Sequence, residues 1–135
     1  MNGKLWIMLG AILAGLAVAS GAFGAHLLKD AVKGWYPDEA LQIKRLGDWE
    51  TAARYQMYHA LGLLAIGLVI QVFPKSGGGL LNAAAICLAL GTVLFSGSLY
   101  LLVVTGVTKW GAVTPLGGLL YLAGWGLFAA AAAKS

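Results

Sequence analysis

The charged residues of this chain stand far apart except in one segment. Four uncharged stretches of 24, 20, 33 and 24 residues follow one another, each bounded by a lysine or arginine. A helix needs about 20 apolar residues to cross a hydrocarbon core of about 30 Å. Each stretch is therefore long enough for one crossing, the third after a turn at Ser76-Gly77-Gly78-Gly79. The predicted spans lie near 5–28, 52–73, 80–105 and 113–133.

The composition supports a membrane protein and excludes several other classes. Hydrophobic residues make up 60% of the chain and charged residues 10%, against about 45–50% and about 25% in soluble domains. The net charge of +4 comes from scattered bases without a basic patch, so we expect no nucleic-acid partner. Backbone groups inside lipid must be satisfied within a helix or a closed barrel, and the runs lack the alternation of barrel strands. We expect an all-α, integral membrane four-helix transmembrane bundle, one domain over 1–135.

The start of the chain has a second interpretation. Residues 1–25 carry Lys4 before an apolar centre and small residues after it, as a secretory signal peptide does. The apolar stretch is longer than the 7–15 residues usual for the core of such a peptide. We therefore expect this segment to be retained as the first span.

The distribution of basic residues predicts an orientation. Four crossings put both termini on one side, and the polar loop 29–51 and the turn 106–112 on the other. The loop side carries more Lys and Arg near the span ends, and such residues favour the cytoplasm. We expect a multi-pass protein of the cell (inner) membrane with a cytoplasmic loop and both termini outside. The bases on the loop side are Lys29, Lys33, Lys44, Arg45, Arg54 and Lys109.

The polar loop contains signals for a helix. Pro37-Asp38-Glu39 is typical of a helix opening, because acids are favourable at a helix N-terminus. Asp48 is expected to cap the second span. The residues between them suggest a short amphipathic helix lying in the membrane interface, with a solvated connector as the alternative. The residues that suggest this helix are Leu41, Lys44, Arg45, Leu46 and Trp49.

Aromatic residues and small residues further define the spans. Aromatic rings near predicted span ends are expected at the headgroup level; they are Trp6, Tyr36, Trp49 and Trp110. Small residues recur at helical spacing in the first span, at Gly10, Ala14, Ala17, Gly21 and Ala25. Small residues let helix backbones approach closely in lipid. Besides the lipid bilayer, they allow a homo-oligomer or another membrane protein as a partner.

Polar side chains gather in the half of each span beside the polar loop. Intramembrane polar groups are costly and usually face the bundle interior or a cavity. The simplest interpretation is a hydrogen-bond network that ties His26 to His59 and to the Ser/Tyr face of the third span. A solute or ion cavity and a cofactor or metal site are the alternatives. The candidate polar cluster comprises His26, Arg54, Tyr55, Gln56, His59, Ser96, Ser98, Tyr100 and Thr114.

Few specific catalytic, transport or metal-binding functions fit these residues. The spans contain no Asp or Glu, so a membrane carboxylate for proton-coupled transport is missing. Two histidines are too few for a zinc site, and the single Cys87 excludes a multi-cysteine motif. We expect no enzyme, no metal and no cofactor. Haem held by His26 and His59 is the weakest alternative.

Four sequence blocks resemble the domain-of-unknown-function 423 family. The resemblance implies a four-span protein of the cell membrane with an uncleaved first helix, and it supplies no catalytic residue, cofactor or substrate. The segment 29–45 is longer than the family pattern. The blocks are Gly21-Ala22-Phe23-Gly24-Ala25-His26, Thr51-Ala52-Ala53-Arg54-Tyr55-Gln56-Met57-Tyr58-His59-Ala60, Phe95-Ser96-Gly97-Ser98-Leu99-Tyr100 and Thr114-Pro115-Leu116-Gly117-Gly118, followed by Gly124-Trp125.

These observations lead to two functional hypotheses. The first is a non-enzymatic bundle that organises the membrane or binds a partner, because the chain lacks a catalytic constellation. The second is a small-solute or ion pathway, or a binding pocket, in the leaflet beside 29–51. The second hypothesis predicts one cavity that reaches both His59 and Ser96.

Overall fold

The computed structural model describes residues 2–73 and 78–134, and within them every regular element is a helix. All except α2 are long and apolar enough to cross a membrane, which confirms the predicted fold class. Residues 76–77 of the predicted turn lie outside the described residues, and Gly78 and Gly79 already belong to a helix. The helices are α1 (Gly3–His26), α2 (Leu28–Trp35), α3 (Glu39–Val72), α4 (Gly78–Thr105) and α5 (Trp110–Ala133).

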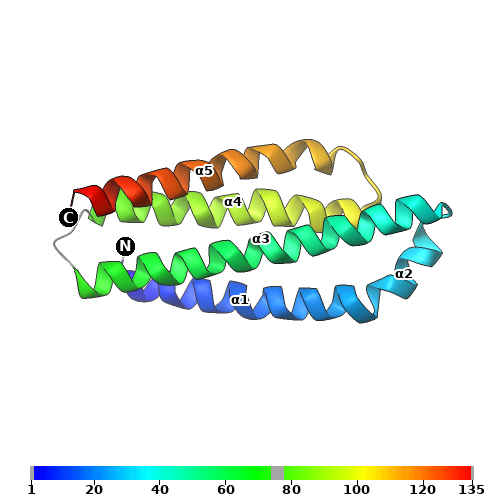
Figure 1. Ribbon diagram of the computed structural model, residues 1–135, viewed down its shortest axis with the longest axis horizontal. Coiled ribbons are helices and arrows are strands. Elements are labelled where there is room, and N and C mark those ends of the chain that lie inside the picture. Colours follow the sequence, from blue (N-terminus) through cyan, green and yellow to red (C-terminus); the bar gives the residue numbers. More distant parts are fainter. Residues whose placement is uncertain (1, 74–77, 135) are drawn as a thin grey trace.

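The four long helices lie side by side in a row (Figure 1). α1 packs along α3, α3 along α4 and α4 along α5. The two ends of the chain lie at the same end of the molecule, and α2, the start of α3 and the α4–α5 turn lie at the other (Figure 1). We call this second end the loop end. A row has outer edges at α1 and α5, so the bundle is open and carries grooves along its sides.

The segment 29–51 is helical almost throughout, which corrects the prediction of a polar loop. α2 is the only short helix described there, and 39–51 form the first turns of α3, which continues into the membrane span. The predicted separate amphipathic helix over Leu41–Trp49 is therefore wrong. Gly47 alone is too weak a break to end a helix, since a single glycine costs only about 1 kcal/mol.

Asp38 caps the N-terminus of α3, and the helix begins where the Pro37-Asp38-Glu39 pattern predicts. Its carboxylate accepts hydrogen bonds from the backbone N–H groups of Ala40 and Leu41, at 3.4 and 3.3 Å. Asp48 was the predicted cap of the span, and that prediction is wrong. It lies inside α3 and forms an ion pair with Arg45 at 2.9 Å.

α2 closes the loop end of the bundle. It buries Leu28 and Val32, and Tyr36, which follows it, donates a hydrogen bond to the Val103 carbonyl of α4 at 2.6 Å. On its exposed side the Lys33 ammonium, 2.8 Å from Asp30 Oδ1, lowers the pKa of that carboxyl.

Two of the four aromatic residues expected at the headgroup level are buried in the protein, and a third is half-buried. Trp6 is 3% exposed and donates its indole N–H to Asn82 Oδ1 at 2.8 Å. Tyr36 is buried, and Trp49 lies between helices. Only Trp110 is exposed. A buried indole or phenol needs a hydrogen-bond partner, and Trp6 and Tyr36 find theirs on α4.

Small residues bring helices together at some of the predicted positions. A Cβ added at Gly10 would lie 2.7 Å from the Ala60 carbonyl oxygen, so α1 and α3 touch backbone to backbone there. Ala17 is buried as well. Gly21 has open space around it and Ala25 is exposed, so these two positions make no close helix contact.

Candidate functional site

Most residues of the candidate polar cluster divide between two lateral grooves. One groove lies between α1 and α4 along α3, and we call it the α1/α4 groove. The other lies between α3 and α5 along α4, and we call it the α3/α5 groove. Gln56, Ser96 and Tyr100 line the first, whereas Tyr55 and His59 line the second.

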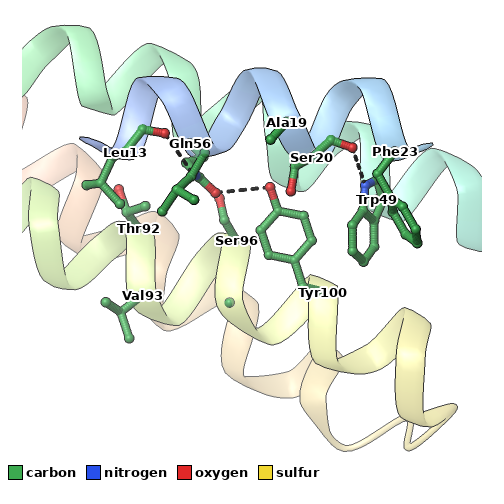
Figure 2. Close-up of a pocket in the computed structure, with 12 residues that line it drawn as sticks. Leu13, Ala19, Ser20, Phe23, Trp49, Gln56, Thr92, Val93, Ser96 and Tyr100 are labelled. Carbon is green, nitrogen blue, oxygen red and sulfur yellow. Dashed lines mark hydrogen bonds between the residues drawn. The ribbon is translucent and has the colours of Figure 1, made fainter. Parts of the chain in front are cut away.

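Gln56 joins three helices at the α1/α4 groove. Its side-chain amide donates to the Leu13 carbonyl of α1 at 2.8 Å, and its carbonyl oxygen accepts from the Tyr100 hydroxyl of α4 at 3.0 Å (Figure 2). Only 6% of Gln56 is exposed. Hydrogen bonds of this kind contribute about 0.6–2 kcal/mol each in a membrane, so Gln56 fixes the spacing of α1, α3 and α4.

Two further hydrogen bonds reinforce this contact. Ser96 donates to the Ala52 carbonyl at 2.7 Å. The indole N–H of Trp49 donates to the Ser20 carbonyl at 2.8 Å (Figure 2). The Trp49 ring also lies 4.5 Å from the Tyr100 ring. In each case the acceptor is a carbonyl of the neighbouring helix, so these side chains connect helices and leave few polar groups for a ligand.

The α1/α4 groove has a volume of about 570 Å³ and opens sideways from the bundle. Apolar side chains and small residues supply most of its lining. An added Cβ at Gly97 would meet no other atom within 4 Å, which leaves free room along that wall. The lining residues are Leu13, Leu16, Ala19, Ser20, Phe23, Trp49, Gln56, Thr92, Val93, Ser96, Gly97 and Tyr100.

His59 is central to the aromatic and polar contacts along the α3/α5 groove. Its ring stacks on that of Tyr121, with centroids 3.3 Å apart and planes at 6°. Nδ1 lies 2.6 Å from the Tyr55 carbonyl oxygen, and because a carbonyl only accepts, the proton is assigned to Nδ1. Tyr121 in turn donates to the Thr92 hydroxyl at 3.3 Å. Tyr55 stacks on Phe95 at 4.7 Å.

Tyr55, Gln56 and His59 lie close together in the sequence but do not share one face of α3. Tyr55 and His59 lie together along the α3/α5 groove, but Gln56 faces the other one. Successive residues of a helix point about 100° apart, which is enough to send Gln56 to the opposite groove once α3 has neighbours on both sides.

Four predicted residues lie apart from both grooves or contribute little to them. Ser98 and Thr114 join α4 to α5 through their hydroxyl groups, 2.7 Å apart. Arg54 is exposed and pairs with Glu50 on the same helix. His26 is exposed at the last residue of α1.

The structure does not bring His26 to His59. Gln56 bonds Leu13, so Leu13 marks the level of this part of α3 on α1. His26 lies thirteen residues further along α1, about 20 Å at 1.5 Å per residue, and His59 lies one turn beyond Gln56 in the other direction. The haem alternative does not fit these positions. In residues 2–73 and 78–134 there is also no group of three or more His, Cys, Asp or Glu that could hold a metal ion.

In the described part of the chain, His59 and Ser96 line different grooves, and this does not support the single cavity predicted to reach both. His59 lines the α3/α5 groove and Ser96 the α1/α4 groove. Ser96 is 1% exposed and bonded to Ala52. The helices α3 and α4 pack together between the two grooves.

Sequence reasoning missed several members of these contacts. Thr92 stands one helical turn before Ser96, which stands one turn before Tyr100, so extending that spacing by four residues would have found it. Tyr121 and Asn82 carry no such signal, because each is an isolated polar residue in an apolar run. The hydrogen bond of Trp49 to the Ser20 carbonyl is not predictable from the position of Trp49 near a span end.

The comparisons with known proteins agree on one family. The family model described as "Protein of unknown function (DUF423)" matches residues 20–118. The "UPF0382 membrane protein YwdK" of Bacillus subtilis is 44% identical over 131 residues, 97% of this chain and 98% of the relative. A "UPF0382 membrane protein" of Staphylococcus epidermidis is 46% identical over 122 residues, 90% of this chain and 89% of the relative. No solved structure matches.

Proposed function

Because this chain belongs to the DUF423 family of membrane proteins, we propose that it is a non-enzymatic protein that organises the bilayer by holding one lipid acyl chain in the α1/α4 groove. The observation that carries this proposal is the state of the polar groups along that groove. Gln56 and Trp49 donate hydrogen bonds to backbone carbonyls of α1, and Tyr100 donates to the side chain of Gln56. What remains for an occupant is an apolar wall.

The size of the groove favours a narrow chain over a protein helix. A helix with its side chains is 10–12 Å across and rises 5.4 Å per turn, so one turn fills roughly 400–600 Å³. The groove of about 570 Å³ would take little more than one turn. An acyl chain is far thinner and can lie along the groove between Leu16 and Val93.

The same hydrogen bonds support a non-enzymatic role. A catalytic group must be within reach of a substrate atom, whereas Ser96 is 1% exposed and donates to a carbonyl. His59 lies flat against Tyr121 with its Nδ1 proton on Tyr55. Neither side chain is paired as nucleophile and base in the way that nucleophilic catalysis requires.

Filling the groove tests the proposed function. Gly97→Leu adds a side chain where an added Cβ meets nothing within 4 Å, so it should occupy the groove without disturbing the helices. We expect native mass spectrometry of the wild-type protein in mild detergent to show a bound lipid that occupies the α1/α4 groove. The Gly97→Leu variant should bind that lipid about tenfold more weakly, since a loss of about 1.4 kcal/mol in binding free energy is a factor of ten in affinity.

Gly126→Leu is the matched control. Gly126 also has open space around an added Cβ, but it lies on α5, away from the α1/α4 groove. The Gly126→Leu variant should retain lipid as the wild type does. Equal lipid retention by all three proteins, with circular dichroism showing intact helices, would contradict the proposal. A native dimer whose interface is broken by Gly97→Leu would assign the groove to a second copy of the chain instead.

We also propose that the loop end faces the cytoplasm, in an inner membrane. The bases on that side support this orientation, because Lys and Arg are retained on the cytoplasmic side. In a Cys87→Ala background, Lys134→Cys should react in intact cells with a maleimide that does not cross membranes. Lys44→Cys should react only after the cells are broken. The reverse pattern would place the termini in the cytoplasm.

A further inference from the structure

A third groove, at the loop end of the bundle, combines cations with apolar side chains. Lys44, Arg45 and Asp48 of α3 form one wall, and Thr108 and Gly111 come from the turn before α5 and its first residues. The rest of the lining is mostly apolar, from Phe95, Leu99 and Leu102 of α4, with Thr114 and Pro115 of α5. Its volume is about 460 Å³. We call this the Arg45 groove.

Arg45 has more hydrogen-bond donors than its neighbours can satisfy. Only 6% of it is exposed. Its Nη1 donates to Asp48 at 2.9 Å, and its guanidinium lies 5.7 Å from the centre of the Tyr36 ring. Nε is buried and has no hydrogen-bond partner among the described residues. Guanidinium carries five N–H donors and is always charged, and a buried charge needs acceptors around it.

Lys44 adds a second positive charge to the mouth of this groove. It is exposed and forms no ion pair in the part of the chain that the structure describes. Asp48, the one carboxylate of the lining, is already paired with Arg45. The mouth therefore carries a net positive charge, directly beside an apolar interior.

We propose that the Arg45 groove binds the phosphate group of an anionic phospholipid. Lys44 and the guanidinium of Arg45 hold the phosphate, because guanidinium geometry matches phosphate oxygens and Lys acts as a point charge. The start of the lipid chain covers Phe95, Leu99 and Leu102. Free phosphate would leave these apolar side chains uncovered, which favours the lipid over the free ion.

The position of the groove in the fold agrees with this ligand. Arg45 lies about two turns before residue 52, where the sequence places the start of the second span, so the guanidinium lies at the depth of lipid headgroups. The site is separate from the α1/α4 groove of the proposed function. Gly97→Leu tests that groove and leaves this one unchanged, so the two proposals fail independently.

Lys44→Gln tests the phosphate site. Lys44 is exposed, so the change should not affect folding, whereas removing Arg45 would leave Asp48 unpaired inside the protein. Protein in detergent is offered equal amounts of phosphatidylglycerol and phosphatidylcholine, and native mass spectrometry counts the bound lipids. Wild type should prefer the anionic lipid by about tenfold or more, and Lys44→Gln should reduce that preference by about fivefold.

Lys29→Gln is the matched control, because it removes the same charge from an exposed lysine at the same end of the molecule but outside the Arg45 groove. It should keep the wild-type preference. The proposal would be overturned if both variants lost the preference for the anionic lipid equally, or if the wild type showed no such preference. Millimolar inorganic phosphate should not displace the lipid. Displacement that depends on Lys44 would overturn the lipid assignment in favour of free phosphate.

Discussion

Trp49→Ala should lower the free energy of unfolding by about 3 kcal/mol, near the lower end of the range for replacing a packed tryptophan with alanine. The Trp49 ring lies between α1 and α4, 5.4 Å from the Phe23 ring and 4.5 Å from the Tyr100 ring. An added Cβ at Gly24 would lie 2.7 Å from it. Its removal takes away these ring contacts at the place where three helices meet.

Trp49→Phe separates the ring from the hydrogen bond. It keeps an aromatic ring in the same place and loses the bond to the Ser20 carbonyl, so it should cost only about 1 kcal/mol. Both variants can be measured by unfolding in mixed micelles, followed by circular dichroism. If Trp49→Ala were as stable as the wild type, the contact between α1, α3 and α4 described above would be wrong.

Gly117→Ala should destabilise the protein by about 2–3 kcal/mol, an overpacking effect. A Cβ at this position would lie 2.7 Å from Phe95 Cβ and 2.8 Å from Phe95 Cα. The nearest atoms belong to the backbone and the first side-chain atom of α4, so no rotamer change relieves the contact. The helices α4 and α5 must move apart, and the hydrogen bond between Ser98 and Thr114 is strained with them.

The neighbouring Gly118→Ala is the control for this prediction. An added Cβ at Gly118 comes no closer than 4.0 Å to the Phe95 ring. It should be neutral or stabilising by up to about 1 kcal/mol, because alanine favours the helix over glycine. The same unfolding measurement distinguishes the two variants. Equal stabilities would show that α4 and α5 do not cross at Gly117.

The four spans could be predicted because they depend on one local property of the sequence. An isolated charged residue is costly inside lipid, so the distances from Lys4 to Lys29 and from Lys109 to Lys134 mark where helices can cross. The number of crossings then places both termini at one end, as the fold has them (Figure 1). Neither step requires knowledge of which helix packs on which.

The candidate site could be predicted only as a depth in the membrane. Spacing along a helix places Gln56 and Tyr100 in the same half of the bundle, and they are indeed bonded. The groove that each residue faces depends on the order of the helices in the row. That order, set by close contacts such as those at Gly10 and Gly117, decides that His59 meets Tyr121. His26 is separated from His59 along the helix axis instead.

The segment before the second span could not be predicted for a different reason. Its charges and Trp49 are typical of a headgroup-level loop, and they also fit the first turns of a longer helix. The partners that decide between the two come from distant parts of the chain, since Ser20 binds Trp49 and Val103 binds Tyr36. Only the assembled bundle supplies them.

The most direct test of the proposed function is a crystal structure of the protein from crystals grown in a lipid phase. We predict elongated electron density along the α1/α4 groove, beside Gly97 and Val93 and past the hydrogen bond between Gln56 and Tyr100. A chain of ordered waters in that groove, or the side chains of a neighbouring copy filling it, would contradict an acyl chain as its occupant.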